Sequence, residues 1–393
     1  MCFIRAGCQG RDIILRRVKA LLYLGPKPPP VSGYANVVVE LHKCLVAENI
    51  PVRFVPTLPS FLAFLFPGVA WRVCRTLYLA ALLPICAPMI PFSRGTYQSL
   101  NGGLGLLFDL VCAGLARICG KSVYLHHHSF SYLHRRSALA ALVFSAAGER
   151  AMHVVNCDAM KSRLQKLYPM ARRVSVVSNV GILAQGDPLK FQPAETADPG
   201  GGAEFDGKES QRPLNLGFMA YFNREKGLDT FCEVVKTLRD QGAPVVGVAV
   251  GPVHDAELTA RLRSEFTGVV DFRPPAYGKD RDAFFNEIDV LLFPSRYPNE
   301  AEPLTIYHSL AAGVPVVATD MGCLRNMLEG TSCSAALPCA DFARGAIDHI
   351  GASLPQLMAR EVCRASVSAD FYQTIERNRQ NLGEFLSFIR QSD

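Results

Sequence analysis

The sequence has no C-x-x-C pair, although it contains 13 cysteines in 393 residues. The cysteines are odd in number and scattered, whereas zinc sites and disulfide frameworks use paired, regularly spaced cysteines. We therefore expect neither a zinc site nor a disulfide framework, and we expect the protein to work in a reducing compartment such as the cytosol.

The N-terminal stretch MCFIRAGCQGRDIILRRVK has no apolar core and no small-residue cleavage site. It does not match a secretory signal, which agrees with a cytoplasmic location. The chain also lacks a G-x-G-x-x-G fingerprint, because Phe108 stands where a third glycine would follow Gly103 and Gly105. Nicotinamide-dependent enzymes use that fingerprint after a strand, so this class loses its main support.

A chain of 393 residues predicts two or three domains, and a share of 49% hydrophobic residues is enough for large cores. The net charge of +6 is modest for this length. Such a balance gives slight support for phosphate-rich ligands or an anionic membrane surface, and it gives no case for nucleic acid.

Two stretches, Phe54 to Trp71 and Thr76 to Ser93, contain no charged residue. Each is at the lower edge of the length that a spanning helix needs, and prolines interrupt both. Arg72 and Arg75 lie between the stretches, which disfavours a transmembrane hairpin. We predict buried helices with an interfacial face that contacts the membrane peripherally.

Short apolar runs alternate with helical patterns along the chain, which is typical of α/β proteins with parallel sheets. The predicted strands are 19–25, 52–55, 121–125, 151–156, 174–178, 214–221, 245–250, 269–273, 290–293 and 314–318. The predicted helices are 34–48, 106–119, 158–167, 228–238, 282–287, 304–312 and 371–390. Residues 184–213 are rich in glycine, proline and charge, which predicts a linker.

The stretch from Ile288 to Gly322 combines a buried strand, a polar loop, a helix and a second strand. The loop carries Glu300 and Glu302, and Pro303 fits the start of a helix, where its missing N–H costs nothing. Ligands of open parallel sheets bind outside the carboxyl ends of the strands. The two glutamates are therefore candidate binding residues.

This stretch resembles the signature of retaining glycosyltransferases of family four, in which FPS precedes E-x7-E-A-x-A-x-G-x-P-V-V-A. Glu300 takes the place of the first family glutamate, and His308 takes the place of the second. The resemblance is strongest over residues 214–322. It implies the GT-B fold, in which two Rossmann-like domains face each other across a cleft. It also implies transfer of a sugar from a nucleotide diphosphate sugar to a hydroxyl acceptor with retention.

The same resemblance assigns parts in donor binding to further residues. Lys226 matches the family lysine that binds the donor diphosphate. Tyr221 stands where the family has an arginine, and Arg224 is close enough to substitute for it. Glu300 would bind hydroxyl groups of the donor sugar and orient its ring. The other implied donor contacts are Glu302, the N–H groups of Leu304 and Thr305, His308, and the pair Ser32 and Gly33.

Three consecutive histidines, His126 to His128, follow a predicted strand. Side chains alternate in direction along an extended chain, and no acid or cysteine lies nearby in the sequence, so we expect no metal there. The family places a histidine after this strand near the reacting sugar, and either His126 or His128 fits that place. Because cationic side chains and helix N–H groups would stabilise the diphosphate, we expect no metal ion or other cofactor.

The predicted organisation is an acceptor-side domain (1–183), a linker (184–213), a nucleotide-sugar-binding domain (214–370) and a C-terminal helix (371–393) that returns to the first domain. The expected partners are a nucleotide-sugar donor and a glycan or lipid-linked acceptor, in polysaccharide or glycolipid assembly at the cytoplasmic face of the membrane. Two alternatives stay open. Tyr221 and His308 favour a pseudoenzyme or assembly partner without donor binding. An epimerase acting on sugar nucleotides would share the architecture.

Overall fold

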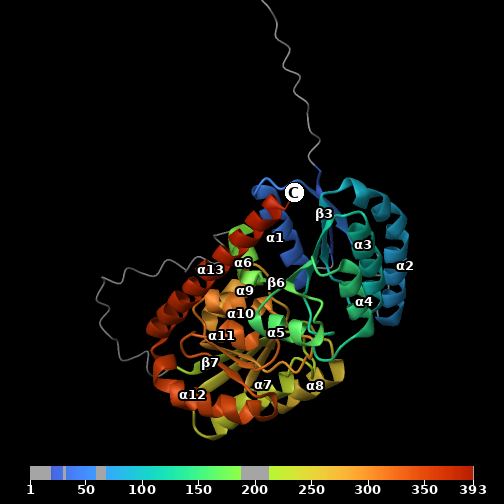
Figure 1. The fold of residues 1–393 in the computed structure, drawn as a ribbon. Coiled ribbons are helices and arrows are strands. Elements are labelled where there is room, and N and C mark those ends of the chain that lie inside the picture. The colour runs from blue at the N-terminus through green and yellow to red at the C-terminus, as the bar shows by residue number, and fades with distance from the viewer. Residues whose placement is uncertain (1–18, 30–31, 59–67, 187–211, 393) are drawn as a thin grey trace, which may run out of the picture.

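The computed structural model describes residues 19–29, 32–58, 68–186 and 212–392. They form two α/β domains, each built on a six-stranded sheet (Figure 1). Neighbouring strands are parallel throughout both sheets. The predicted fold class, two Rossmann-like domains, is confirmed. Most of the predicted linker, residues 187–211, lies outside the described residues, as do residues 1–18.

The first sheet has the strand order β2-β1-β3-β4-β5-β6. Its strands are β1 (Leu21–Gly25), β2 (Val52–Pro56), β3 (Gly95–Ser99), β4 (Ser122–His126), β5 (Met152–Val155) and β6 (Arg173–Val176). The helices of this domain are α1 (Gly33–Ala47), α2 (Gly68–Cys86), α3 (Leu106–Ile118), α4 (Ala138–Ala147), α5 (Asp158–Leu167) and α6 (Asn179–Gly186). Every residue of β1 is buried, as expected for an apolar strand covered by helices on both faces.

The second sheet has the order β12-β11-β10-β7-β8-β9. Its strands are β7 (Leu214–Met219), β8 (Val245–Val250), β9 (Val270–Arg273), β10 (Val290–Phe293), β11 (Val316–Thr319) and β12 (Ala335–Leu337). The helices of this half are α7 (Leu228–Asp240), α8 (Ala256–Glu265), α9 (Lys279–Glu287), α10 (Leu304–Ala311), α11 (Leu324–Leu328), α12 (Phe342–Met358) and α13 (Arg360–Gln391). The chain reverses its direction of growth between the neighbouring strands β7 and β10, which opens a crevice at their carboxyl ends.

The sequence prediction missed β3, a central strand of the first sheet. Its sequence, GTYQS, contains no apolar run, yet all five residues are buried. Gly95 allows β3 to pair closely with β4, since a side-chain carbon there would meet the Ser122 carbonyl at 2.6 Å. The polar composition therefore concealed a strand whose side chains form hydrogen bonds inside the domain.

The prediction of buried helices over residues 54–93 is wrong for most of the part that the structure describes. Helix α2 and the short 3₁₀ helix after it (η1, Ala87–Phe92) leave large apolar side chains in solvent, with Leu77 exposed to 64% and Phe92 to 79%. Within the described ranges, Val73–Phe92 is one helical stretch long and apolar enough to cross a membrane, and 17% of its most apolar window is buried. Residues 59–67 lie outside the described ranges.

Helix α13 starts at Arg360, earlier than predicted, and runs along both domains (Figure 1). Near its end, Phe385 packs edge-on against Tyr97 and Tyr124 of the first domain. The Arg94 side chain also donates a 2.7 Å hydrogen bond to the carbonyl of Ile389. The predicted return of the C-terminal helix to the first domain is thus present in the structure.

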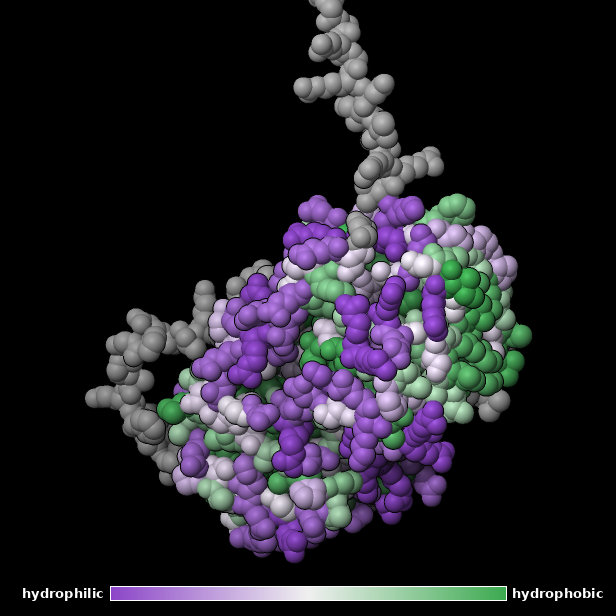
Figure 2. Space-filling model, viewed as in Figure 1, coloured by the Kyte–Doolittle hydropathy of each residue, from purple (hydrophilic) through white to green (hydrophobic). Residues whose placement is uncertain are grey.

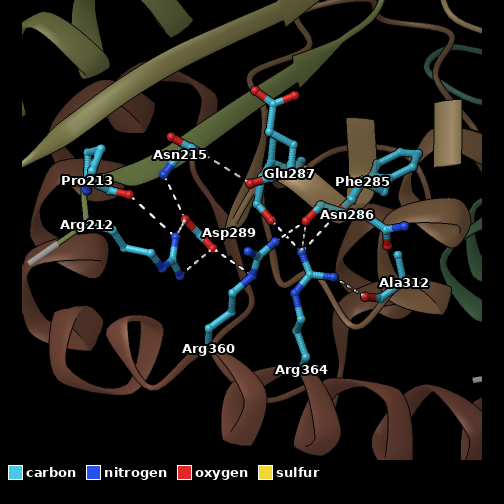
Figure 3. Close-up of polar contacts among 11 residues, drawn as sticks. Arg212, Pro213, Asn215, Phe285, Asn286, Glu287, Asp289, Ala312, Arg360 and Arg364 are labelled. Atoms are coloured by element: carbon cyan, nitrogen blue, oxygen red, sulfur yellow. Dashed lines mark hydrogen bonds and ion pairs between the residues drawn. The ribbon is translucent and has the colours of Figure 1, made fainter. Parts of the chain in front are cut away.

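Arg360 and Arg364, near the start of α13, bind the second domain through an ion pair and hydrogen bonds (Figure 3). The Arg364 guanidinium donates to the carbonyls of Ala312 (2.8 Å), Phe285 (2.9 Å) and Ile288 (2.7 Å). Arg360 pairs with the buried carboxylate of Asp289 at 3.2 Å. Asp289 also accepts from Arg212 (2.8 Å) and from the N–H of Asn215 (2.8 Å), which ties the beginning of the second domain to the same point.

The two domains meet through Glu302, which lies between β10 and α10. Its buried carboxylate accepts 2.7 Å hydrogen bonds from the Ser178 hydroxyl, the Asn179 N–H and the Tyr307 hydroxyl. Ser178 and Asn179 follow β6 of the first domain, so both carboxylate oxygens are used between domains. Burial raises the pKa of Glu302 to about 7, although these hydrogen bonds oppose the rise.

No disulfide framework was expected from the sequence, and the structure contains one disulfide that was not predicted. Cys157 follows β5 and Cys323 follows β11, and their sulfur atoms are bonded. The two residues are 166 positions apart in the sequence, so spacing gave no signal for this pair. The disulfide is a second link between the domains.

We predict that Arg364→Met destabilises the protein by about 2–4 kcal/mol, because three partly buried carbonyls would lose their charged donor. Arg379→Met is the matched control on the same helix, since Arg379 makes a partly exposed ion pair with Glu376 and should change stability by less than about 1 kcal/mol. Urea unfolding of both variants measures the difference. Equal midpoints for the two variants would contradict the anchoring role of Arg364.

Candidate functional site

A cleft of about 560 Å³ lies between the two domains, at the carboxyl ends of both sheets. One wall comes from the loops after β1 and β4, and the other wall comes from the loops after β7 and β10. Ten of the predicted site residues line it. They are Ser32, Gly33, His128, Tyr221, Lys226, Glu300, Glu302, Leu304, Thr305 and His308.

An ion pair between Lys226 and Glu300 lies in the wall formed by the second domain. The Lys226 ammonium is 2.5 Å from Oε2 of Glu300, and the buried Ser295 hydroxyl donates to the same oxygen at 3.0 Å. The ammonium also lies 4.9 Å from the centroid of the Tyr297 ring. The two side chains are 18% and 11% exposed, so the pair is largely shielded but still reachable from the cleft.

Two glycines bring the backbone segments of this wall together. Gly227 has φ +77°, and a side-chain carbon there would lie 2.1 Å from the Pro294 carbonyl. Gly322 has φ +56°, and a side-chain carbon there would lie 2.1 Å from the Glu300 carbonyl. Only glycine fits such positions without moving the backbone. The first glycine sets Lys226 beside the end of β10, and the second supports the loop that carries Glu300.

Two helix starts face the cleft from opposite walls. Leu304 and Thr305 begin α10, and their N–H groups belong to the first turn, which has no partner within the helix. On the other wall, Ser32 caps α1, because its hydroxyl accepts from the N–H of Ala35 at 3.2 Å. Unpaired N–H groups at a helix start favour anionic ligands.

Of the predicted histidines, His128 lines the cleft and His126 does not. His126 is buried, with Nδ1 2.9 Å from the Tyr97 hydroxyl, and burial lowers its pKa to about 3. The His128 ring stacks between Tyr34 and His126, and its buried Nε2 has no hydrogen-bond partner in the described structure. Burial also lowers the pKa of His128 well below its usual value. A neutral His128 can therefore bind a ligand by a hydrogen bond but does not carry a proton to it.

Arg224 is placed away from the predicted site. It is exposed and does not belong to the cleft lining, and its main-chain carbonyl accepts from Arg296 at 3.2 Å. Tyr221 lines the cleft and is half-exposed. The centroid of its ring lies 5.0 Å from the centroid of the His254 ring. The substitution of Arg224 for the family arginine thus finds no support in the geometry.

The contacts of Glu302 and His308 differ from those predicted. The carboxylate of Glu302 is directed at Ser178 and Asn179, so its hydrogen bonds join the domains and leave no oxygen free for a donor. His308 lies at the cleft with Nε2 3.2 Å from the Arg281 guanidinium. The position that is acidic in the family therefore carries a histidine here, and an arginine contacts it.

Four other residues at the site were not predicted from the sequence. Asn156 and Asn179 line the cleft from the ends of β5 and β6, and the Oδ1 atom of each is buried without a hydrogen-bond partner in the described structure. Ser295 belongs to the FPS motif, which marked its position but not its contact with Glu300. Arg281 has no motif around it and could not be found from the sequence.

A larger cavity, about 790 Å³, lies at the other edge of the first sheet, where β4, β5 and β6 begin. Open parallel sheets bind ligands at the carboxyl ends of their strands, so we assign the functional site to the interdomain cleft. Among the described residues, no group of three or more histidines, cysteines or acids is arranged to hold a metal ion.

Comparison with known proteins agrees with this architecture. Residues 213–352 match the family model described as glycosyl transferases group 1. The chain is 29% identical over 207 residues to the lipopolysaccharide core biosynthesis mannosyltransferase LpsB of Rhizobium meliloti, which covers 49% of this chain and 55% of that protein. The chain thus spans about half the length of this curated relative.

Two solved structures resemble almost the whole chain. Sucrose-phosphate synthase of Thermosynechococcus elongatus superposes with a TM-score of 0.67 at 14% identity, covering 95% of this chain and 100% of that one. HepE of Anabaena, crystallised with UDP-glucose, gives a TM-score of 0.60 at 15% identity, covering 94% and 99%. At this identity the likeness concerns the fold alone. Residues 213–352 thus match the model of the glycosyl transferases group 1 family, and the chain has the GT-B fold.

Proposed function

We propose that this protein is a glycosyltransferase that moves a sugar from a nucleotide diphosphate sugar to a hydroxyl acceptor. The observation that carries this proposal is the pair of Lys226 and Glu300 in the interdomain cleft. It places a cation suited to a diphosphate beside a carboxylate suited to sugar hydroxyls. The relative from Rhizobium meliloti, a mannosyltransferase by name, supports a hexose as the transferred sugar and a polysaccharide or glycolipid as the product.

Lys226 would stabilise the leaving diphosphate while positive charge grows at the anomeric carbon. An ammonium group has three donors, so it can keep its bond to Glu300 and still bind phosphate oxygens. The N–H groups at the start of α10 would add to this stabilisation from the same wall. Because these groups supply positive charge themselves, we propose a reaction that needs no metal ion or other cofactor.

Glu300 would hold the donor sugar, and Ser295 and Lys226 fix the orientation of its carboxylate. His128 lies across the cleft on the acceptor side and, being neutral, would accept or donate one hydrogen bond to the sugar. We propose that transfer proceeds with retention, as in family four. Proton NMR of the product anomer is the direct measurement of that stereochemistry.

A second function is favoured by one specific observation, the basic pair of Arg281 and His308 where the family has a carboxylate. A pseudoenzyme that has lost donor binding would tolerate this change. An epimerase would bind the donor but need no acceptor. Product analysis with and without acceptor separates the epimerase from a transferase.

We further propose that the first domain contacts an anionic membrane surface from the cytoplasmic side. Exposed apolar side chains recur on one side of α2 (Val73, Leu77 and Ile85) and on one side of α3 (Leu107, Val111 and Ile118). Figure 2 shows the corresponding hydrophobic area over these helices, on the right of the molecule. A lipid-linked acceptor would explain such a surface next to the acceptor side of the cleft.

The charge distribution favours lipid with anionic head groups as the partner of this face. Residues 1–183 contain 21 Lys and Arg against 6 Asp and Glu, although the whole chain has a net charge of only +6. Between Pro51 and Gly148 the only acid is Asp109, which is buried and bound by Asn101. An exposed apolar surface on a basic domain is typical of proteins that lie in a membrane interface.

We predict that Glu300→Gln retains the fold, because the residue lies on a loop, and loses on the order of 10²-fold in turnover. Turnover with a panel of nucleotide sugars, assayed by release of nucleoside diphosphate, measures this loss. Glu257→Gln, an exposed change on α8, is the control and should behave as native. A Glu300→Gln enzyme with native turnover would contradict the assigned role.

Lys226→Ala should weaken binding of the donor and of the free nucleoside diphosphate to a similar extent, and should leave nucleoside binding nearly unchanged. The reason is that Lys226 would contact only the diphosphate. Calorimetry with the three ligands tests this, with Lys236→Ala on α7 as the control, since Lys236 forms an exposed pair with Asp240. Equal losses for all three ligands would argue against a diphosphate contact, and loss of native turnover in EDTA would argue against a metal-free reaction.

His308→Ala should bind the donor a few-fold more weakly than native, since a neutral imidazole supplies one hydrogen bond worth about 1 kcal/mol. The double change Tyr221→Arg with His308→Glu restores the family pattern and serves as the comparison. Calorimetric donor binding by native protein supports the transferase. Binding by the double variant alone would instead support the pseudoenzyme.

Vesicle sedimentation should show binding to phosphatidylcholine vesicles that contain phosphatidylglycerol, and weaker binding in high salt. Leu77→Glu combined with Ile118→Glu should reduce this binding by about tenfold or more, because charge would replace exposed apolar contacts. Val362→Glu is the matched control, an exposed apolar residue on α13. Unchanged sedimentation of the double variant would exclude this face as the contact.

A further inference from the structure

The disulfide between Cys157 and Cys323 joins the two domains beside the cleft. Cys157 directly precedes α5 in the first domain, and Cys323 directly precedes α11 in the second. Their Cα atoms are 5.9 Å apart, and both side chains are buried. The described part of the chain contains nine further cysteines, and all of them are free thiols.

Both cysteines adjoin segments that carry site residues. Asn156, the neighbour of Cys157, lines the cleft. The N–H of Cys323 donates to the Ala301 carbonyl at 3.2 Å, and Gly322 lies against the Glu300 carbonyl. The disulfide therefore holds the loop that presents Glu300 against the strand end that presents Asn156.

The disulfide acts next to a second link, the hydrogen bonds of Glu302 with Ser178 and Asn179. In the first domain, Cys157 follows β5, and Ser178 and Asn179 follow the neighbouring strand β6. In the second domain, Glu302 follows β10, and Cys323 follows the neighbouring strand β11. Glu302 alone leaves the two cleft walls free to turn about one contact at this edge, within the limits that helix α13 sets. The disulfide adds a second contact at the same edge and so further restricts the relative motion of the walls.

We propose that Cys157 and Cys323 form a redox modification site that sets how far the cleft opens. In the oxidised protein the domains are held together at the base of the cleft. A dithiol reductant converts the pair to two thiols by giving two electrons and two protons, and its own sulfurs become a disulfide. The reduced protein keeps Glu302 as its contact at this edge and opens more widely.

The expected compartment favours a reversible bond over a permanent one, although both side chains are buried. The sequence predicts a reducing compartment, where disulfides are usually transient and used in catalysis or sensing. Cys157 lies at the N-terminal end of the ten-residue helix α5, where the helix dipole favours a thiolate and so makes this sulfur the better leaving group. Control of activity by this disulfide rests on the function proposed above. Formation of the bond and opening of the domains do not depend on that function.

The first experiment asks whether the bond forms and opens the domains, without using activity. Full-length protein is treated with diamide or with dithiothreitol, alkylated, digested and analysed by mass spectrometry, and a Cys157–Cys323 linked peptide is expected after diamide only. Hydrogen exchange of the same samples should be at least about threefold faster after reduction at two backbone amides. They are the amide of Asn179, which donates to the Glu302 carboxylate, and the amide of Cys323, which donates to the Ala301 carbonyl.

The double variant Cys157→Ser with Cys323→Ser should exchange like the reduced protein under both treatments. Cys339→Ser, which removes an exposed free thiol in the same domain as Cys323, should respond like native protein. Absence of the linked peptide after diamide, or equal exchange in the oxidised and reduced protein, overturns the proposal. If exchange changes and turnover does not, the control on activity is overturned while the modification site and the proposed transferase both stand.

Discussion

The buried carboxylate of Glu302 determines how the two domains face each other. Each of its oxygens accepts from the first domain, one from the Ser178 hydroxyl and one from the Asn179 N–H. Glu302 is also two residues from Glu300 and one residue before the proline that precedes α10. The contact therefore fixes the wall of the cleft that carries Lys226 and Glu300 relative to the wall that carries Ser32 and His128. A cleft assembled from two separate sheets needs such a constraint, because neither sheet alone positions both walls.

The two domains are joined in two ways, by helix α13 and by contacts between the walls of the cleft. Helix α13 is attached to the second domain through Arg364 and to the first by packing of Phe385. The contacts between the cleft walls include a carboxylate, a disulfide and the close approach of Gly33 to Leu304. Interdomain surfaces of this kind favour relative motion of domains over a fixed arrangement. The helix keeps the domains together while the cleft contacts set the distance between its walls.

The sequence predicted those features that depend on local pattern. Apolar runs located β8 and β10 to the residue, and the bounds of α5 were predicted without error, because burial on both faces and helical periodicity are encoded locally. The glycosyltransferase signature found Lys226, Glu300 and their common wall. Features that depend on distant contacts were missed. The polar strand β3 has no apolar run, and Cys157 and Cys323 are far apart in the chain. The direction of the Glu302 side chain follows from its partners in the other domain, which no local pattern contains.

The buried histidines beneath the cleft have a consequence for acid tolerance. His126, His127 and His128 lie at the end of β4, His153 contacts them from β5, and burial lowers the pKa of each, to about 3 for His126 and His153. In the unfolded chain these imidazoles take up protons near pH 6.5, so the unfolded state binds more protons than the folded state between about pH 6.5 and pH 3. The stability contributed by the neutral histidines is therefore present above that range and is lost as the pH falls through it. The first domain is therefore sensitive to acidification, because the same packing that keeps His128 neutral makes its protonation a route to unfolding.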